Sequence, residues 1–136
     1  MNRAVLDTHI LIWWRSGLQS GLHGRLSTAQ LRLLAHLEDQ GEFVISAITL
    51  WEIAKLVAGK RLEIPRPLDL WLAEIEQHPR IHLEPLTSRI IAASATLENF
   101  HRDPADQLII ATAHCLGLPL ITADERIRAW GGVVTI

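Results

Sequence analysis

Four acidic side chains stand beside short apolar segments that are far apart in the chain: Asp7, Glu52, Asp106 and Asp124. Clusters of carboxylate oxygens bind hard divalent cations such as Mg²⁺ or Mn²⁺. With one or two such ions, a carboxylate cluster becomes a site for phosphodiester hydrolysis, because the ions activate water and neutralise the charge that builds up on the phosphate. Without a metal, the same carboxylates would repel one another and their pKa values would be raised.

Each of these acids also has a structural interpretation. Asp7 and Asp124 can cap the helices expected to follow them, and Glu52 can be a solvated residue on a helix surface. Asp103 and Asp106 can be the N-cap and a first-turn acid of one helix, both favoured by the helix dipole. Composition and spacing alone leave the metal site and the structural interpretation both open.

The pattern of apolar residues predicts the elements that would position these acids. We expect strands at residues 4–6, 43–46, 81–86, 118–122 and 133–135, and a loop at 16–24. We expect helices at residues 8–15, 27–40, 48–58, 68–77, 88–99, 108–116 and 124–130, the sixth opened by Asp103-Pro104.

Strands that alternate with helices predict one α/β domain over residues 1–136. Its parallel sheet would have four to five short strands and would be flanked by helices on both faces, since the strands are continuously apolar. Ligands of open parallel sheets bind beyond the carboxyl ends of the strands. All four acids are expected at that edge.

The composition limits the class of protein. The net charge is −2, with 49% hydrophobic and 21% charged residues, which is typical of a globular domain. A protein that binds nucleic acid by charge alone is usually more basic, so RNA binding must be local or helped by cations. Apolar residues 10–14 are too few to span a membrane, and no signal peptide is expected. The lone Cys115 is expected to be a small buried hydrophobe, which suits a reducing cytoplasm.

Four segments around the acids resemble the PIN-domain family of nucleases. They are AVLDTH at residues 4–9, SAITLWEI at 46–53, DPADQLIIATA at 103–113 and LITAD at 120–124. Any one of them is weak, but together, in the order of the family and over nearly the whole chain, they are specific. In length the chain is most similar to the VapC-type toxins of bacterial toxin–antitoxin pairs.

The resemblance implies a PIN-like sheet and a Mg²⁺- or Mn²⁺-dependent endoribonuclease that cuts structured RNA, such as a transfer or ribosomal RNA. The family's catalytic and metal-binding acids fall on Asp7, Glu52, Asp106 and Asp124, and the polar positions beside them fall on Thr8, Ser46, Thr122 and Asp103. The implied partners are a second copy of the chain and a small VapB-like antitoxin that binds beside the active site. DNA would be contacted only through the antitoxin.

Within the third segment, we predict different roles for two neighbours. Pro104 fits the first position of a helix, so Asp103 falls at the N-cap. Asp106 then lies at the third helical position with its side chain directed past the sheet edge. We expect Asp106 to be the metal ligand and Asp103 to be mainly a helix cap.

Several surface residues have two interpretations. Lys55, Lys60 and Arg61 could border an RNA groove, as could Arg126 and Arg128, or all five could be ordinary solvated surface. His9 is the histidine nearest the expected site; it could touch RNA, but a structural or solvated role is preferred for it.

The tryptophans Trp13, Trp14, Trp51 and Trp71 are expected to be core residues or interface anchors. Of these, Trp13, Trp14 and Trp71 are candidates for contacts with a second copy or an antitoxin. Stacking on RNA bases is the lesser alternative.

Other functions fit the sequence less well. A signalling receiver domain needs adjacent acids after the first strand and a late lysine, but no lysine follows residue 60. A haloacid-dehalogenase-like phosphatase needs Asp-x-Asp where this chain has Asp7-Thr8-His9. A non-catalytic PIN fold would not need all four acids. A processing nuclease outside toxin–antitoxin systems stays open, and a short antitoxin reading frame upstream would favour the toxin.

Overall fold

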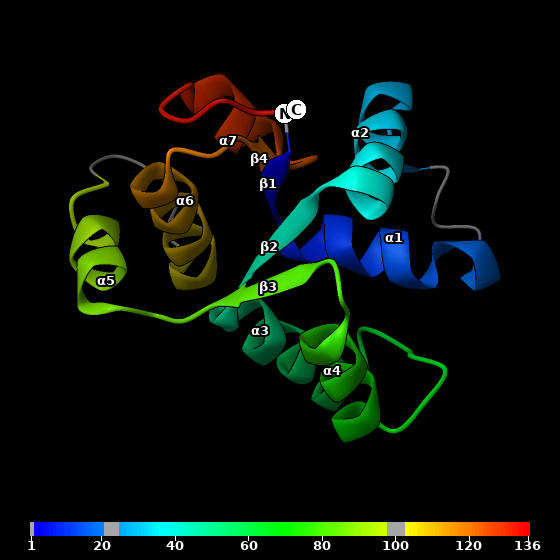
Figure 1. The fold of residues 1–136 in the computed structure, drawn as a ribbon. Helices are drawn as coiled ribbons and strands as arrows, with labels where there is room; N and C mark the ends of the chain where they lie inside the picture. The colour runs from blue at the N-terminus through cyan, green and yellow to red at the C-terminus, as the bar shows by residue number, and fades with distance from the viewer. Residues whose placement is uncertain (1, 21–24, 98–102) are drawn as a thin grey trace.

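A four-stranded parallel sheet, in the order β3-β2-β1-β4, forms the centre of the protein (Figure 1). The computed structural model describes residues 2–20, 25–97 and 103–136. The strands are β1 (Arg3–Leu6), β2 (Glu42–Ser46), β3 (Ile81–Glu84) and β4 (Leu120–Ile121), and every pairing is parallel. The chain leaves β1 toward β2 and β3 and later returns to pair β4 with the other side of β1. Such a switch point at the carboxyl end of a sheet is where ligands bind in open α/β folds.

The helices cover both faces of the sheet, as predicted. They are α1 (Thr8–Ser20), α2 (Thr28–Gln40), α3 (Ala47–Ala58), α4 (Leu68–Gln77), α5 (Ser88–Ser94), α6 (Pro104–Leu116) and α7 (Glu125–Trp130). In Figure 1, α5, α6 and α7 lie on one side of the sheet, and α1 and α2 lie on the other.

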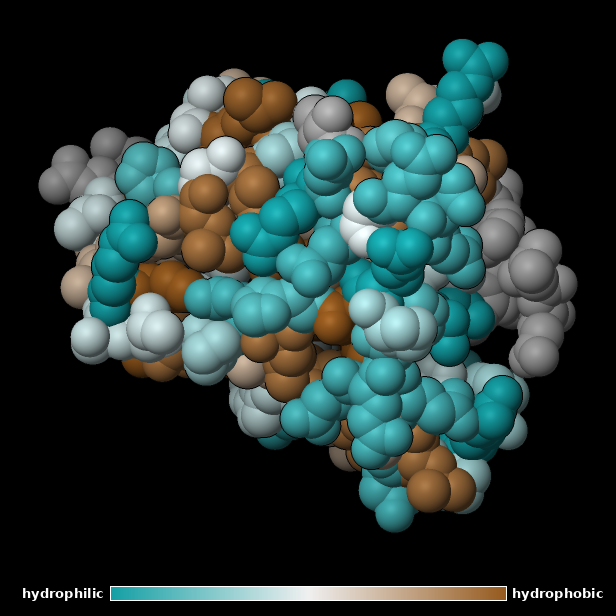
Figure 2. All heavy atoms as spheres, in the orientation of Figure 1, coloured by the Kyte–Doolittle hydropathy of each residue, from teal (hydrophilic) through white to brown (hydrophobic). Residues whose placement is uncertain are grey.

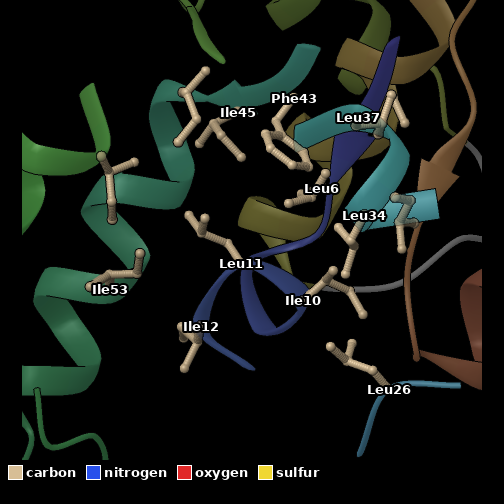
Figure 3. Close-up of a cluster of buried hydrophobic side chains, with 14 of the residues drawn as sticks. Leu6, Ile10, Leu11, Ile12, Leu26, Leu34, Leu37, Phe43, Ile45 and Ile53 are labelled. Carbon is tan, nitrogen blue, oxygen red and sulfur yellow. The ribbon is translucent and has the colours of Figure 1, made fainter. Parts of the chain in front are cut away.

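Alternate strand residues feed two separate hydrophobic cores. Leu6, Phe43 and Ile45 face the core built with α1, α2, α3 and α4, and Figure 3 shows them with Ile10 and Leu11 of α1. The intervening Val5 and Val44 face the other core, built mainly with α6 and α7. This alternation follows from the two-residue period of a strand, and burial on both faces explains why the interior residues of β1 and β2 are apolar.

The prediction of a C-terminal strand at residues 133–135 is wrong. Thr135 forms only an isolated parallel bridge with Leu120. Three backbone hydrogen bonds join residues 134–136 to residues 120–122, but they form no regular strand. The sheet therefore has four strands among the described residues, and β3 and β4 are shorter than expected.

The first helix is longer than expected. It continues to Ser20, so the predicted loop is wrong at residues 16–20. Residues 21–24 of that predicted loop lie outside the described part of the chain. Ile10 and Leu11 are fully buried and anchor its first turns, and a helix held by packing can include a glycine at a cost of about 1 kcal/mol. The helix expected to reach residue 99 ends at Ser94, and residue 99 itself lies outside the described part.

The tryptophans and the cysteine divide between core and surface. Trp71 is only 4% exposed and belongs to the core, so the first of its two interpretations is confirmed and the partner contact is wrong for this residue. Trp14 packs on Phe43 with ring centroids 4.3 Å apart. Trp51 is 55% exposed and does not belong to the core. Cys115 is only partly buried, although full burial was expected.

The outer face seen in Figure 2 is mostly hydrophilic, with separate hydrophobic patches between the polar side chains. In the part of the chain that the structure describes, no helix combines the length and apolar character needed to cross a membrane.

A buried glutamine joins the N-terminal half of the chain to the C-terminal end. Gln30 is 3% exposed, and its Nε2 donates hydrogen bonds to the carbonyl oxygens of Thr122 (3.0 Å) and Ile136 (3.1 Å). Its Oε1 accepts the backbone N–H of Ser27, and the Ser27 hydroxyl accepts the N–H of Gln30, which completes a capping box.

We expect Gln30→Leu to lower the free energy of unfolding by about 1–3 kcal/mol, because it removes the two hydrogen bonds that the buried Nε2 donates to Thr122 and Ile136. Ser27→Ala is the matched control, since it removes only the cap and should cost about 1 kcal/mol. Urea unfolding of both variants measures the difference. Equal losses would show that Gln30 acts only as part of the helix cap.

Candidate active site

The carboxyl edge of the sheet opens into a cavity of about 320 Å³ that brings the predicted acids together. Asp7 follows β1, Asp124 follows β4, Glu52 comes from α3 and Asp106 from α6. The cavity is lined by Asp7, His9, Trp13, Glu52, Asp103, Asp106, Ala123, Asp124 and Arg126. All four predicted acids therefore share one cavity with Asp103, the fifth.

Asp7 is the most buried of these carboxylates, with 6% of its surface exposed. Its Oδ1 accepts the backbone N–H of Thr8 at 2.9 Å, and its Oδ2 accepts the hydroxyl of Thr122 at 2.7 Å. The Thr122 oxygen in turn accepts the backbone N–H of Asp124 at 3.1 Å. Both oxygens of Asp7 are thus held, and Thr122 ties the end of β1 to the segment after β4.

Glu52 is positioned by two threonines, Thr8 and Thr49. The Thr8 hydroxyl donates to Glu52 Oε1 and lies 3.2 Å from the hydroxyl oxygen of Thr49. Thr8 and Thr49 are both buried. Since one hydroxyl carries one hydrogen, Thr8 gives it to Glu52 and can accept that of Thr49. Ser46 caps α3 by accepting the N–H of Ile48 at 3.3 Å, so it acts on the helix that carries Glu52.

Asp103 and Asp106 lie at the start of α6. Asp103 is the N-cap, and its Oδ1 accepts the N–H of Ala105 at 2.9 Å, as the sequence predicted. Asp106 is the third helical residue, one place after Ala105. Glu52, Asp103 and Asp106 each offer an oxygen within 4.8 Å of the other two. Asp103 therefore caps the helix and also belongs to the acidic cluster.

Asp124 lies at the edge of the cavity. It is the N-cap of α7, where its Oδ1 accepts the N–H of Arg126 at 2.8 Å. The same oxygen lies 3.7 Å from Nε of Arg126. A cationic neighbour thus partly offsets this one acid.

Crowding and burial raise the pKa of three acids. Burial raises the pKa of Asp7 above its ordinary value, although the bonds from Thr122 and Thr8 oppose the increase. Burial and then the charges of Asp103 and Asp7 raise the pKa of Glu52. Burial and the surrounding carboxylates raise the pKa of Asp106 to about 8.

This donor set suits a hard divalent cation. Carboxylate oxygens are the ligands that Mg²⁺ and Mn²⁺ prefer, and oxygens of three acids converge here. The charge of His9 lowers the pKa of Asp7 and Glu52 but does not cancel the increase. A bound cation would favour the ionised carboxylates and so remove the cost of crowding them.

Two positioning residues were not predicted from the sequence. Thr49 is a fully buried polar residue three positions before Glu52 in an apolar helix, and that placement was the available signal. Gln30 supports Thr122 from the far side, and the pattern Ser27-x-x-Gln30 signals its cap but not its long-range bonds.

We expect the metal-free protein to lose stability as the pH rises from about 4 to about 8. The folded-state pKa of Asp106 is about 8 and its ordinary value is 3.8, so between them the folded chain binds more protons than the unfolded chain. The free energy of unfolding then falls with increasing pH. The raised pKa values of Asp7 and Glu52 act in the same direction.

Urea unfolding in EDTA at several pH values measures this dependence. Asp106→Asn is the control, because an amide does not titrate and the slope should become shallower. A stability that increases over this range, or an unchanged slope in Asp106→Asn, would contradict the assignment.

Comparisons with known proteins agree with this geometry. Residues 4–132 match the PIN domain family. Ribonuclease VapC22 of Mycobacterium tuberculosis is 33% identical over 130 residues, which cover 95% of this chain and 92% of that protein.

Two solved structures have a similar fold. A toxin–antitoxin complex from Klebsiella pneumoniae gives a TM-score of 0.64 at 21% identity, covering 98% of this chain and 95% of that one. VapBC2 from Rickettsia felis, bound to a DNA fragment from the promoter, gives a TM-score of 0.67 at 14% identity, and the match covers 98% of this chain and 97% of that one. At these identities the structures support the fold alone. The family match over nearly the whole length and the identity to VapC22 show that this chain belongs to the PIN-domain family, among its VapC-type members.

Proposed function

We propose that this protein is a Mg²⁺- or Mn²⁺-dependent endoribonuclease and the toxin of a toxin–antitoxin pair. One observation carries the proposal: oxygens of Glu52, Asp103 and Asp106 lie within 4.8 Å of one another, in a cavity that also contains Asp7 and Asp124. The cavity lies at the switch point of a PIN-family sheet, and a relative over nearly the whole chain is named a ribonuclease.

The residues that would hold the cation are Asp7, Glu52, Asp106 and Asp124, with Asp103 beside them. When bound, the cation supplies Lewis-acid stabilisation of the negative charge that develops on a phosphate under attack by water. The position of each carboxylate is set by groups of the chain itself. Thr122 holds Asp7, Thr8 holds Glu52, and the first turn of α6 presents Asp106.

Fixing the acids before the substrate arrives lowers the cost of organising them during the reaction. Asp7 cannot rotate freely, because both of its oxygens accept hydrogen bonds from the backbone or a buried hydroxyl. Thr8 uses its backbone N–H for Asp7 and its hydroxyl for Glu52, so one residue sets the spacing of two acids.

The proposed partners follow from the relatives. Structures similar to this one include toxin–antitoxin complexes, and one of them is bound to DNA. We propose a small antitoxin that covers the acidic cavity and contacts DNA itself, a homodimer in the cytoplasm, and a structured RNA as substrate. The alternative is an RNA-processing nuclease without an antitoxin, and a short neighbouring gene whose product inhibits cleavage would decide for the toxin.

The purified protein should cut RNA in Mg²⁺ or Mn²⁺ and should stop in EDTA. At neutral pH, millimolar Mg²⁺ or Mn²⁺ should also raise the melting temperature, because a ligand that binds only the folded state stabilises that state. Cleavage that survives thorough chelation would refute the metal requirement. Mapping the 5′ ends of fragments produced in cells would identify the RNA target.

Asp106→Asn and Asp103→Asn should separate the two neighbours on α6. Asp106→Asn should keep the fold but reduce cleavage by roughly 100-fold or more, since loss of even a group supporting a ligand typically costs 10- to 100-fold. Asp103→Asn should keep most of its stability, because asparagine caps a helix nearly as well as aspartate. Its cleavage activity should fall about tenfold or less.

Thermal melts and cleavage at saturating Mn²⁺ compare these two variants. If Asp103→Asn is folded and inactive while Asp106→Asn cuts like the wild type, the roles of the two residues are reversed.

A further inference from the structure

A second cavity, of about 380 Å³, adjoins the acidic one. It is lined by His9, Trp51, Glu52, Lys55, Leu56, Arg61, Asp103 and Ala105. His9, Glu52 and Asp103 line both cavities, so the two form a continuous surface. A chain molecule that is cut at the acids can therefore extend along α3 into the second cavity.

Trp51 is the large apolar side chain in this second cavity. It is 55% exposed and directly precedes Glu52 on α3. Lys55, one helical turn later, places its Nζ 5.5 Å from the centre of the indole ring. The helix thus presents an aromatic ring and a cation on the same surface as one of the proposed catalytic acids.

The end of α3 adds a second cation to this surface. Lys60 has a φ of 58°, in the left-handed region, and donates its N–H to the carbonyl of Val57 at 3.1 Å. Arg61 donates its N–H to the carbonyl of Leu56 at 2.9 Å. This pair of bonds is a Schellman ending, which folds the chain back on the helix and lets Arg61 line the same cavity as Lys55.

We propose that Trp51 stacks on the base of an unpaired nucleotide of the RNA substrate, next to the cut site, while Lys55 and Arg61 bind its phosphates. This inference rests on the proposed nuclease function and assigns a base-binding residue to it. A stacked base makes a stronger contact with an exposed aromatic ring than an exposed ammonium does. The base therefore displaces Lys55 from the ring, and its ammonium becomes available to a phosphate.

Charge also favours RNA as the occupant of this surface. The whole chain has a net charge of −2, and the acids repel phosphates, so a strand crossing the site needs cations close by. Lys55 and Arg61 provide them one cavity away. The cavity on the other flank contains Arg25 and Arg128 but no aromatic side chain, so it can bind phosphate without reading a base.

Stacking on Trp51 requires a base that is not paired in a duplex. A base inside a duplex already stacks on its neighbours, whereas a base in a loop or single strand can turn out onto an aromatic side chain. The enzyme should therefore prefer a cut beside an unpaired nucleotide, including one in the loop of a structured RNA.

The test measures binding of fluorescein-labelled single-stranded RNA, and of a fully paired duplex, in an Asp106→Asn background that suppresses cleavage. Trp51→Ala should weaken the Kd for the single strand roughly 5- to 100-fold, the range that stacking of one base provides. Trp51→Phe should stay within about threefold, because phenylalanine also stacks. Duplex binding should change little in either variant.

Leu70→Ala is the matched control, since Leu70 is equally exposed, at 55%, but lies on α4 and lines neither cavity. Lys55→Gln and Arg61→Gln should weaken the binding of both RNAs, and each should lower the slope of log affinity against log salt concentration by about 1. If Trp51→Ala binds single-stranded RNA as tightly as its Asp106→Asn parent, and cuts it like the wild type when Asp106 is retained, the stacking role is overturned and the nuclease proposal stays intact. A wild-type protein that cuts no RNA refutes the proposed function itself.

Light scattering on the same variants tests the alternative occupant of this surface, a second copy of the chain. If Trp51→Ala dissociates a dimer while each protomer still binds RNA with unchanged affinity, the surface is a contact between copies of the chain and the proposal is overturned.

Discussion

Repulsion among buried carboxylates is the constraint on which the rest of this structure depends. Asp106 is raised to a pKa of about 8 by its burial and by four neighbouring acids. Such a cluster lowers the stability of the metal-free fold, so it persists only because strong local interactions hold its members. Threonine hydroxyls donate to Asp7 and Glu52, and backbone N–H groups at two helix starts bind Asp103 and Asp124.

The structural interpretation of these acids is therefore compatible with the functional one. Asp103 and Asp124 are helix caps in the ordinary sense, and the same geometry directs them into the acidic cavity. A cap oxygen must lie at the amino end of a helix, and in a parallel sheet those ends gather at the carboxyl edge of the strands. Capping thus fixes part of the site at no cost beyond that of forming the helix.

Local features could be predicted from the sequence, and long-range ones could not. The helix cap Asp103 depends on neighbouring residues and was correctly located. The edge that collects the acids followed from the parallel sheet. The length of α1, and the isolated bridge of Thr135 where a fifth strand was expected, depend on tertiary packing that no local pattern encodes.

The exposed Trp51 belongs to the same class of unpredictable features. An apolar helix next to a buried strand predicts a buried tryptophan, yet α3 buries Thr49 and Ile53 and leaves Trp51 in solvent. The reason is rotational: the helix must turn Glu52 toward Thr8, and that orientation carries its preceding neighbour out of the core. If RNA is the substrate, this arrangement couples two binding events. The acids repel phosphate until a cation is bound, so the cation strengthens RNA binding, and by thermodynamic reciprocity RNA must strengthen cation binding by the same factor.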